Sequence, residues 1–343
     1  MIRLVLRLSV TAIVFAIIFW HIDFRSVLMR LQDLQAGPPV LVVFVLATQF
    51  LVMTWRWKRI VDSLSPIPAP YGDLWRALGA SDLYGQLLPS TLGSDLIRAA
   101  MLARRTGFAP ATYSVLVDRI TGLAILLALM VALLPLLAWR IDTKIALALS
   151  LLGLGGGAGL LIFLFLPTRL PSRWLPPTVA PLSTLAMHTR KALFTAVLAP
   201  AVVGGGLFIH VASIALVFLF GRAVGIPLTF LDCLLLVPPA LLLAALPVSL
   251  AGWGIREGAM ASLFALVGIA PADGVTVSIL YGLTAPAIGL AYGLFAVFDS
   301  RGTSNKAPRF TSEAFLNEGK LPSADEERGV EVGNDAPRPS KPA

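Results

Sequence analysis

The sequence predicts an all-α polytopic membrane protein, and two features of its composition indicate this class. Of the 343 residues, 57% are apolar and 13% are charged, whereas a soluble domain carries about 25% charged residues. The apolar residues gather in runs of about 20, the length at which a helix crosses the hydrocarbon core of a bilayer. These features exclude a soluble enzyme, a secreted disulfide scaffold (the chain has one cysteine) and a transmembrane β-barrel, whose strands alternate in short segments.

About six runs are long and apolar enough to be full spans, namely 4–20, 39–57, 112–139, 145–166, 192–220 and 275–298. Arg3 and Arg7 precede the first run and no small-residue cleavage site follows it, which favours an uncleaved signal anchor. Prolines, glycines or charges interrupt the stretches 74–104 and 228–266. We therefore predict a re-entrant helix pair in each of these stretches, with eight full spans as the alternative.

An internal repeat relates the two interrupted stretches. Three blocks recur in the same order: Ile-Pro with Asp five residues after the proline, Leu-Pro with Arg nine residues after the proline, and Gly-x-Ala-Pro-Ala. They lie within 67–123 in the first copy and within 226–283 in the second. Three full spans separate the copies, so the second copy enters the membrane from the opposite face. This arrangement is the inverted repeat of many secondary transporters.

The charges predict an orientation with both ends inside. The net charge of +8 belongs to residues 1–299, because residues 300–343 hold seven basic and seven acidic residues. Basic residues beside apolar spans are a topology signal rather than a nucleic-acid-binding patch. Ten would lie inside: Arg56, Lys58, Arg59, Arg76, Arg104, Arg105, Arg169, Arg173, Arg190 and Lys191. Five would lie outside: Arg25, Arg30, Arg140, Lys144 and Arg222. The polar, proline-rich residues 300–343 are predicted to be a disordered cytoplasmic tail, and residues 1–299 the transmembrane domain.

Six ionisable residues lie within or beside the repeat segments at membrane depth, namely Asp95, Arg98, Asp118, Arg119, Arg256 and Glu257. Left unpaired, six such charges would cost about 15–20 kcal/mol, so we expect them to pair or to line water. Asp95 and Arg98 have the i, i+3 spacing that lets them meet on one helix face. The neighbours Asp118-Arg119 and Arg256-Glu257 point about 100° apart on a helix, so cross-repeat pairs such as Asp118 with Arg256 are expected.

This network has two interpretations: a structural ion cluster, or a two-sided site for an anionic headgroup. In the second interpretation, helices that begin after Pro89 and Pro247 present free N–H groups, and Arg98 and Arg256 make bidentate phosphate contacts. The candidate substrate-binding residues are then Ser90, Thr91, Asp95, Arg98, Asp118, Arg119, Ser249, Arg256 and Glu257.

Other patterns indicate structure rather than chemistry. The three histidines have no metal-ligand spacing, and no glycine-rich segment ends in the Lys-Ser or Lys-Thr of a phosphate loop, so we predict neither metal nor cofactor. The glycine-rich stretches 153–159 and 204–206 favour close helix packing. Five tryptophans near span ends predict an interfacial belt, namely Trp55, Trp57, Trp75, Trp139 and Trp174.

Three motifs resemble the lysylphosphatidylglycerol synthase transmembrane-domain family, which is also called flippase-like. They are Leu-Leu-Pro-Ser-Thr-Leu-Gly-Ser-Asp-Leu-Ile-Arg (87–98), Val-Asp-Arg-Ile-Thr-Gly-Leu (117–123) and Leu-Pro-Val-Ser-Leu-Ala-Gly-Trp-Gly-Ile-Arg-Glu-Gly (246–258). The resemblance covers residues 1 to about 299 and implies a bacterial or archaeal lipid-handling protein. Ser94 stands where the family often has a second glycine. The 44 residues of the tail do not correspond to a soluble synthetase domain, so lysyltransferase activity is not expected.

We therefore expect a translocator of an anionic phospholipid or lipid-linked intermediate in the bacterial cytoplasmic (inner) membrane. The expected partners are the lipid and a lipid-modifying enzyme, with no nucleic acid. The alternatives are a non-transporting membrane subunit of a lipid or cell-envelope biosynthesis complex, and a membrane-embedded lipid transferase. The sequence leaves the identity of the lipid, the direction, the energy coupling and the oligomeric state open.

Overall fold

The computed structural model describes residues 39–84, 93–169, 180–246 and 252–299, and these residues form helices and connecting turns without any strand. This confirms the predicted all-α class. The described residues up to Ala296 belong to one compact unit, and all packing described below lies within it. The first predicted span (4–20) and the predicted tail (300–343) lie outside the described residues.

Five segments are long and apolar enough to cross a membrane: Val40–Leu64, Phe108–Ala132, Thr143–Pro167, Pro200–Ala223 and Pro271–Ala291. They belong to α3 (Pro39–Leu64), α6 (Phe108–Ala132), α8 (Thr143–Arg169), a π-helical turn η4 (Pro200–Gly204) continued by α10 (Gly205–Ala223), and α13 (Pro271–Gly282) followed by α14 (Thr284–Asp299). Each overlaps a predicted span, so the chain is a polytopic membrane protein. The exact number of spans and the orientation stay predictions.

Shorter helices lie between these segments: α4 (Tyr71–Tyr84), α5 (Gly93–Thr106), α7 (Leu134–Arg140), α9 (Ala180–Phe194), α11 (Phe230–Ala244) and α12 (Ile255–Ala265). Two predicted spans are each divided into two helices, α6 and α7 in one case and α13 and α14 in the other. Pro135 and Pro286 lie just after these divisions. Proline ends the preceding helix because it has no N–H to donate to the carbonyl four residues earlier.

The helices of the two predicted repeat copies, together with the helix before each copy, pack in the same order. Around the first copy α3 packs on α4 and α6, α4 on α5, and α5 on α6; around the second, α10 packs on α11 and α13, α11 on α12, and α12 on α13. Gly107 before α6 and Gly268 before α13 both have positive φ, at 86° and 82°. Residues with a side chain rarely adopt this conformation. These parallels support the repeat, whose boundaries stay a prediction.

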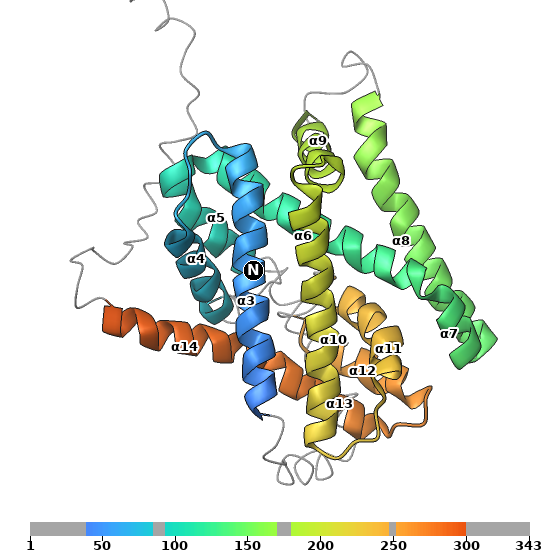
Figure 1. The fold of residues 1–343 in the computed structure, drawn as a ribbon. Helices are drawn as coiled ribbons and strands as arrows, with labels where there is room; N and C mark the ends of the chain where they lie inside the picture. Colours follow the sequence, from blue (N-terminus) through green and yellow to red (C-terminus); the bar gives the residue numbers. More distant parts are fainter. Residues whose placement is uncertain (1–38, 85–92, 170–179, 247–251, 300–343) are drawn as a thin grey trace, which may run out of the picture. The chain divides into compact units, whose positions relative to one another are not determined.

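The helices that precede the two copies, α3 and α10, lie side by side and run in opposite directions (Figure 1). The side-chain amide of Gln49 donates to the carbonyl of Ile209 at 3.2 Å and to the Ser213 hydroxyl at 2.9 Å. Two turns further along α3, Arg56 reaches back to the carbonyl of Val202. Rising numbers in α3 therefore meet falling numbers in α10, the relation that an inverted repeat requires.

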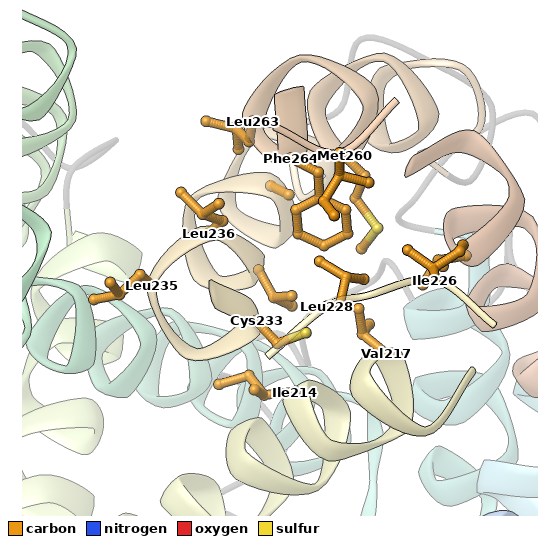
Figure 2. Close-up of a cluster of buried hydrophobic side chains, with 14 of the residues drawn as sticks. Ile214, Val217, Ile226, Leu228, Cys233, Leu235, Leu236, Met260, Leu263 and Phe264 are labelled. Carbon is orange, nitrogen blue, oxygen red and sulfur yellow. The ribbon is translucent and has the colours of Figure 1, made fainter. Parts of the chain in front are cut away.

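Among the described residues, the largest buried apolar cluster lies around the second copy, where side chains of α10, α11 and α12 converge (Figure 2). Leu236, Met260 and Phe264 are fully buried there, together with Cys233. Lipid tails are as apolar as these side chains, so close van der Waals packing holds the helices together more than exclusion of water does.

We predict that Gly274→Ala lowers the free energy of unfolding by about 1–3 kcal/mol. A Cβ at position 274 would lie 2.8 Å from the Cα of Ala261 and from the carbonyl oxygen of Met260, so α12 and α13 would have to move apart. Gly155→Ala in α8 is the matched control, because a Cβ there meets nothing within 4 Å. Thermal unfolding of the purified protein in detergent measures both, and equal midpoints would contradict the prediction.

Candidate functional site

Five charged side chains from α3, α5 and α6 form a chain of alternating sign, which we call the first-copy cluster. The Asp118 carboxylate lies between Arg56, at 3.0 Å, and Arg98, at 3.1 Å. The Asp95 carboxylate lies between Arg98, at 2.8 Å, and Arg119. Each carboxylate is thus shared by two guanidinium groups, and Arg98 is held at the centre by both.

Local helix geometry explains most of these contacts. Asp95 lies in the first turn of α5, where the helix dipole stabilises a negative charge. Asp95 and Arg98 are three residues apart and pair on one face, as the spacing predicts. Asp118 and Arg119 are neighbours on α6 and diverge, so that Asp118 reaches Arg56 and Arg98 while Arg119 reaches Asp95.

Arg56 is the member of this cluster that sequence reasoning missed. We expected it among the charges at the inner surface, but it is 5% exposed. Its guanidinium donates to the Thr121 hydroxyl at 2.6 Å and to the main-chain carbonyls of Asp118, at 3.0 Å, and Val202, at 3.2 Å. The close approach of its Nη1 to Asp118 Oδ1 is an ion pair without a directed hydrogen bond.

Two glycines of the run 204–206 pack against Arg56, from which an added Cβ would still be at ordinary contact distance. A Cβ on Gly205 would lie 3.4 Å from the Arg56 Cβ, and one on Gly206 would lie 3.5 Å from the Arg56 Nε. Close helix packing, which the run predicts, therefore occurs here around a buried charge. The accepting carbonyl of Val202 belongs to η4, and π-helical turns are frequent at functional sites.

An aromatic ring covers the centre of the cluster. The Arg98 guanidinium lies 5.1 Å from the ring centroid of Trp57, and the Trp57 indole N–H donates to the Ser114 hydroxyl at 3.3 Å. Trp57 is completely buried, so its assignment to the interfacial belt was wrong. The ring fills the space between α3, α5 and α6, and its π face favours a cation.

The two ends of the first-copy cluster differ in exposure. The side chains of Arg56 and Arg98 are 6% and 9% exposed, those of Asp95 and Asp118 are 13% and 14%, and that of Arg119 is 32%. The cluster is therefore buried at its Arg56 end and accessible at its Arg119 end.

A second cluster lies in the second copy, between α12 and α13. The Arg256 guanidinium contacts the Glu257 carboxylate at 2.6 Å and the Ser278 hydroxyl at 3.1 Å. The Ser278 hydroxyl donates to Glu257 at 3.0 Å, and the Gly254 N–H donates to the other Glu257 oxygen at 2.6 Å. The Glu257 side chain is completely buried.

The pairing of Arg256 with Glu257 corrects the expectation that neighbours in sequence must pair elsewhere. Both residues lie in the first turn of α12. Gly254, with a φ of 85°, turns the chain so that its N–H meets the Glu257 side chain, and the Arg256 side chain folds back over the same carboxylate. The expected cross-repeat pair of Asp118 with Arg256 is not formed, because Arg56 and Arg98 hold Asp118.

Close packing surrounds Arg256 on several sides. Its guanidinium lies 4.9 Å from the ring centroid of Trp253 and 5.8 Å from that of Tyr281. A Cβ on Gly282 would overlap the Arg256 guanidinium at Nη2, so glycine leaves room for the guanidinium in this position. Ser278 lies four residues before Gly282, just as Asp118 lies four residues before Gly122. The repeat thus places a serine where the first copy has its central carboxylate.

The structure thus divides the predicted site residues. Asp95, Arg98, Asp118 and Arg119 meet in the first-copy cluster, and Arg256 and Glu257 meet in the second. Ser90, Thr91 and Ser249 lie outside the described residues. In the part of the chain that the structure describes, no three His, Cys, Asp or Glu residues group as a metal site.

Together, the five apolar helical segments and the charged clusters within the helix packing define a polytopic membrane protein. Residues 4–293 match the family model of the lysylphosphatidylglycerol synthase TM region, and the chain belongs to this family. The resemblance carried by the three sequence motifs is thereby confirmed. No curated protein sequence matches the chain. Membership indicates a membrane protein of lipid metabolism or of flippase type, and the matched region is a transmembrane region rather than a catalytic domain.

We predict that Glu257→Gln lowers the free energy of unfolding by about 3–5 kcal/mol, because it leaves Arg256 buried without its counter-charge. Asp62→Asn is the control. It removes the more exposed partner of Lys58 in an i, i+4 pair of α3, where the loss is about 0.3–0.5 kcal/mol. Thermal unfolding in detergent compares the two variants. A Glu257→Gln protein as stable as the control would show that the second cluster does not hold α12 and α13 together.

Proposed function

We propose that this protein translocates an anionic phospholipid or lipid-linked intermediate between the leaflets of the bacterial cytoplasmic membrane. The observation that carries the proposal is the first-copy cluster, in which three arginines gather around two carboxylates with one end accessible. Planar guanidinium groups bind phosphate oxygens in pairs. A phosphate can therefore take the place of a carboxylate in such a cluster.

The physical need for such a site is the cost of moving a charged headgroup through hydrocarbon. A single charge at the bilayer centre costs at least about 2.5–3.5 kcal/mol. Arginines fixed within a helix bundle offset this cost for the headgroup, while the acyl chains stay in the surrounding lipid. Asp95 and Asp118 hold the arginines in place when no headgroup is bound.

The opposite directions of α3 and α10 also favour a translocator. Inverted repeats let one half of a protein rock against the other, so that a site opens alternately to the two faces. Gln49 and Arg56 of α3 bond to α10 and η4, and His210 of α10 donates to the Gly122 carbonyl of α6 at 2.9 Å. Polar contacts of this kind are specific enough to define two alternative arrangements.

The same proposal implies a partner protein that supplies the lipid. The family description names the synthesis of a modified phospholipid, so we propose a lipid-modifying enzyme as the partner that supplies the lipid. We assign the protein itself no catalytic reaction.

A leaflet-exchange assay tests the proposal. In proteoliposomes that contain headgroup-labelled lipids, quenching from outside should reveal exchange that depends on the protein and is lost in Arg98→Gln. Arg105→Gln on the same helix is the control, because Arg105 is exposed and pairs with Asp73 at 3.3 Å outside the cluster. We expect the control to exchange lipid like the wild type.

Two results would contradict the translocator. A folded wild-type protein that exchanges none of the labelled lipids would favour the non-transporting membrane subunit. Chemical turnover of a labelled lipid by the purified protein would favour the lipid transferase.

A further inference from the structure

We propose that the anionic group binds to the first-copy cluster alone, on Arg98 and Arg119, and that Asp95 is the carboxylate it displaces. Arg256, which the repeat relates to Arg98, is then a structural side chain that holds α12 on α13. The inference rests on the proposed function for its lipid ligand, although the binding itself can be measured separately. The recognised chemistry is a phosphate ester or a free phosphate.

The two related arginines have different surroundings. Arg98 contacts two carboxylates, one on its own helix and one on α6. Arg256 contacts one carboxylate and one hydroxyl. Three residues before Arg98 lies Asp95, whereas three residues before Arg256 lies Trp253. The second copy therefore has no carboxylate at the place where Asp95 could exchange with a ligand.

The second cluster is closed to an incoming anion. Glu257 is completely buried and accepts bonds from Arg256, Ser278 and the Gly254 N–H. An anion would have to remove this carboxylate from all three partners and leave a charge buried without them, which is the costly situation for an ion pair in a protein interior.

The first-copy cluster is open where Asp95 joins Arg119, whose side chain is 32% exposed. If an anion displaces Asp95, Arg98 keeps its contact with Asp118 at 3.1 Å, so the centre stays ordered. Asp95 itself lies in the first turn of α5, where main-chain N–H groups and the helix dipole favour a carboxylate that has lost its arginines. After the exchange, Arg98 therefore keeps Asp118 as its partner, and Asp95 keeps the main-chain N–H groups at the start of α5.

Charge also favours an anion at this place. The five side chains in ion-pair contact carry three positive and two negative charges. Asp82 of α4 lowers the attraction because its charge acts on Arg98, but its carboxylate is not within ion-pair distance of that guanidinium. The buried end is fixed by Arg56, which bonds to Thr121 and to two main-chain carbonyls. The more exposed end of the cluster is the Arg119 end.

The experiment measures binding to the full-length protein in detergent by the quenching of tryptophan fluorescence, since Trp57 lies against Arg98. The probes are dihexanoyl phosphatidylglycerol, inorganic phosphate and uncharged dihexanoylglycerol. We expect Arg119→Gln to weaken binding of the phospholipid about tenfold, the effect of one charge-assisted hydrogen bond. We expect Asp95→Asn to tighten it by about threefold or more, because the neutral amide competes less for the arginines.

Two second-copy variants are the matched comparison. Ser278→Ala and Arg256→Lys should lower the midpoint of thermal unfolding and leave the affinity of the folded protein within about twofold of the wild type. A tenfold loss of affinity in either folded variant would overturn the inference in favour of a site shared by both copies. Weaker binding in Asp95→Asn would overturn the exchange, since a merely structural Asp95 predicts that result.

The probes separate the sources of the anion. Binding of the phospholipid, with or without phosphate, supports the inference, whereas binding of phosphate alone would overturn the lipid source. A wild-type protein that binds no anionic probe would overturn the site. Normal binding without leaflet exchange would overturn the proposed function and leave the site intact.

Discussion

Arginine and carboxylate side chains within an apolar helix bundle must find partners, and the arrangement around them follows from this constraint. Gly205 and Gly206 pack beside Arg56, and Gly282 leaves room for the Arg256 guanidinium. Trp57 and Trp253 each cover one guanidinium with an aromatic face. Small residues, aromatic rings and charges therefore occur together, since each buried guanidinium needs both room and a favourable surface.

The two copies meet this constraint in different ways. In the second copy one carboxylate satisfies an arginine, a hydroxyl and a main-chain N–H, and forms a closed unit. In the first copy the carboxylates are shared along a line of arginines that ends at an accessible residue. In the proposed repeat, one half would serve stability while the other half would keep the contacts that we propose are exchanged.

Hydropathy predicted the all-α class and the long apolar helices, because lipid exposure demands long apolar runs. The pairing of Asp95 with Arg98 was equally accessible, since it depends on one helix alone. Arg56 could not be found in this way: it stands near the end of an apolar run, where a basic residue is ordinarily interfacial. The same reasoning placed Trp57 in the interfacial belt, although its side chain is completely buried.

The pairing of Arg256 with Glu257 shows a different limit. The rule that neighbours point about 100° apart holds for side chains that extend outward from a regular helix. In the first turn of α12, Glu257 instead turns back to the Gly254 N–H, and Arg256 follows it. A helix start with a glycine of positive φ changes which neighbours can meet, and the helical spacing of the sequence does not reveal this.

The π-helical turn Pro200–Gly204 contacts the buried charge of Arg56, so the number of residues in this turn affects that contact. A π-turn holds one residue more than an α-turn, and Val202 within it accepts the bond from Arg56. Loss of one residue here would rotate the start of this turn relative to α10 by about 100° and carry the Val202 carbonyl away from the guanidinium. In the evolution of the family, an arginine at position 56 and the additional residue should therefore be gained and lost together.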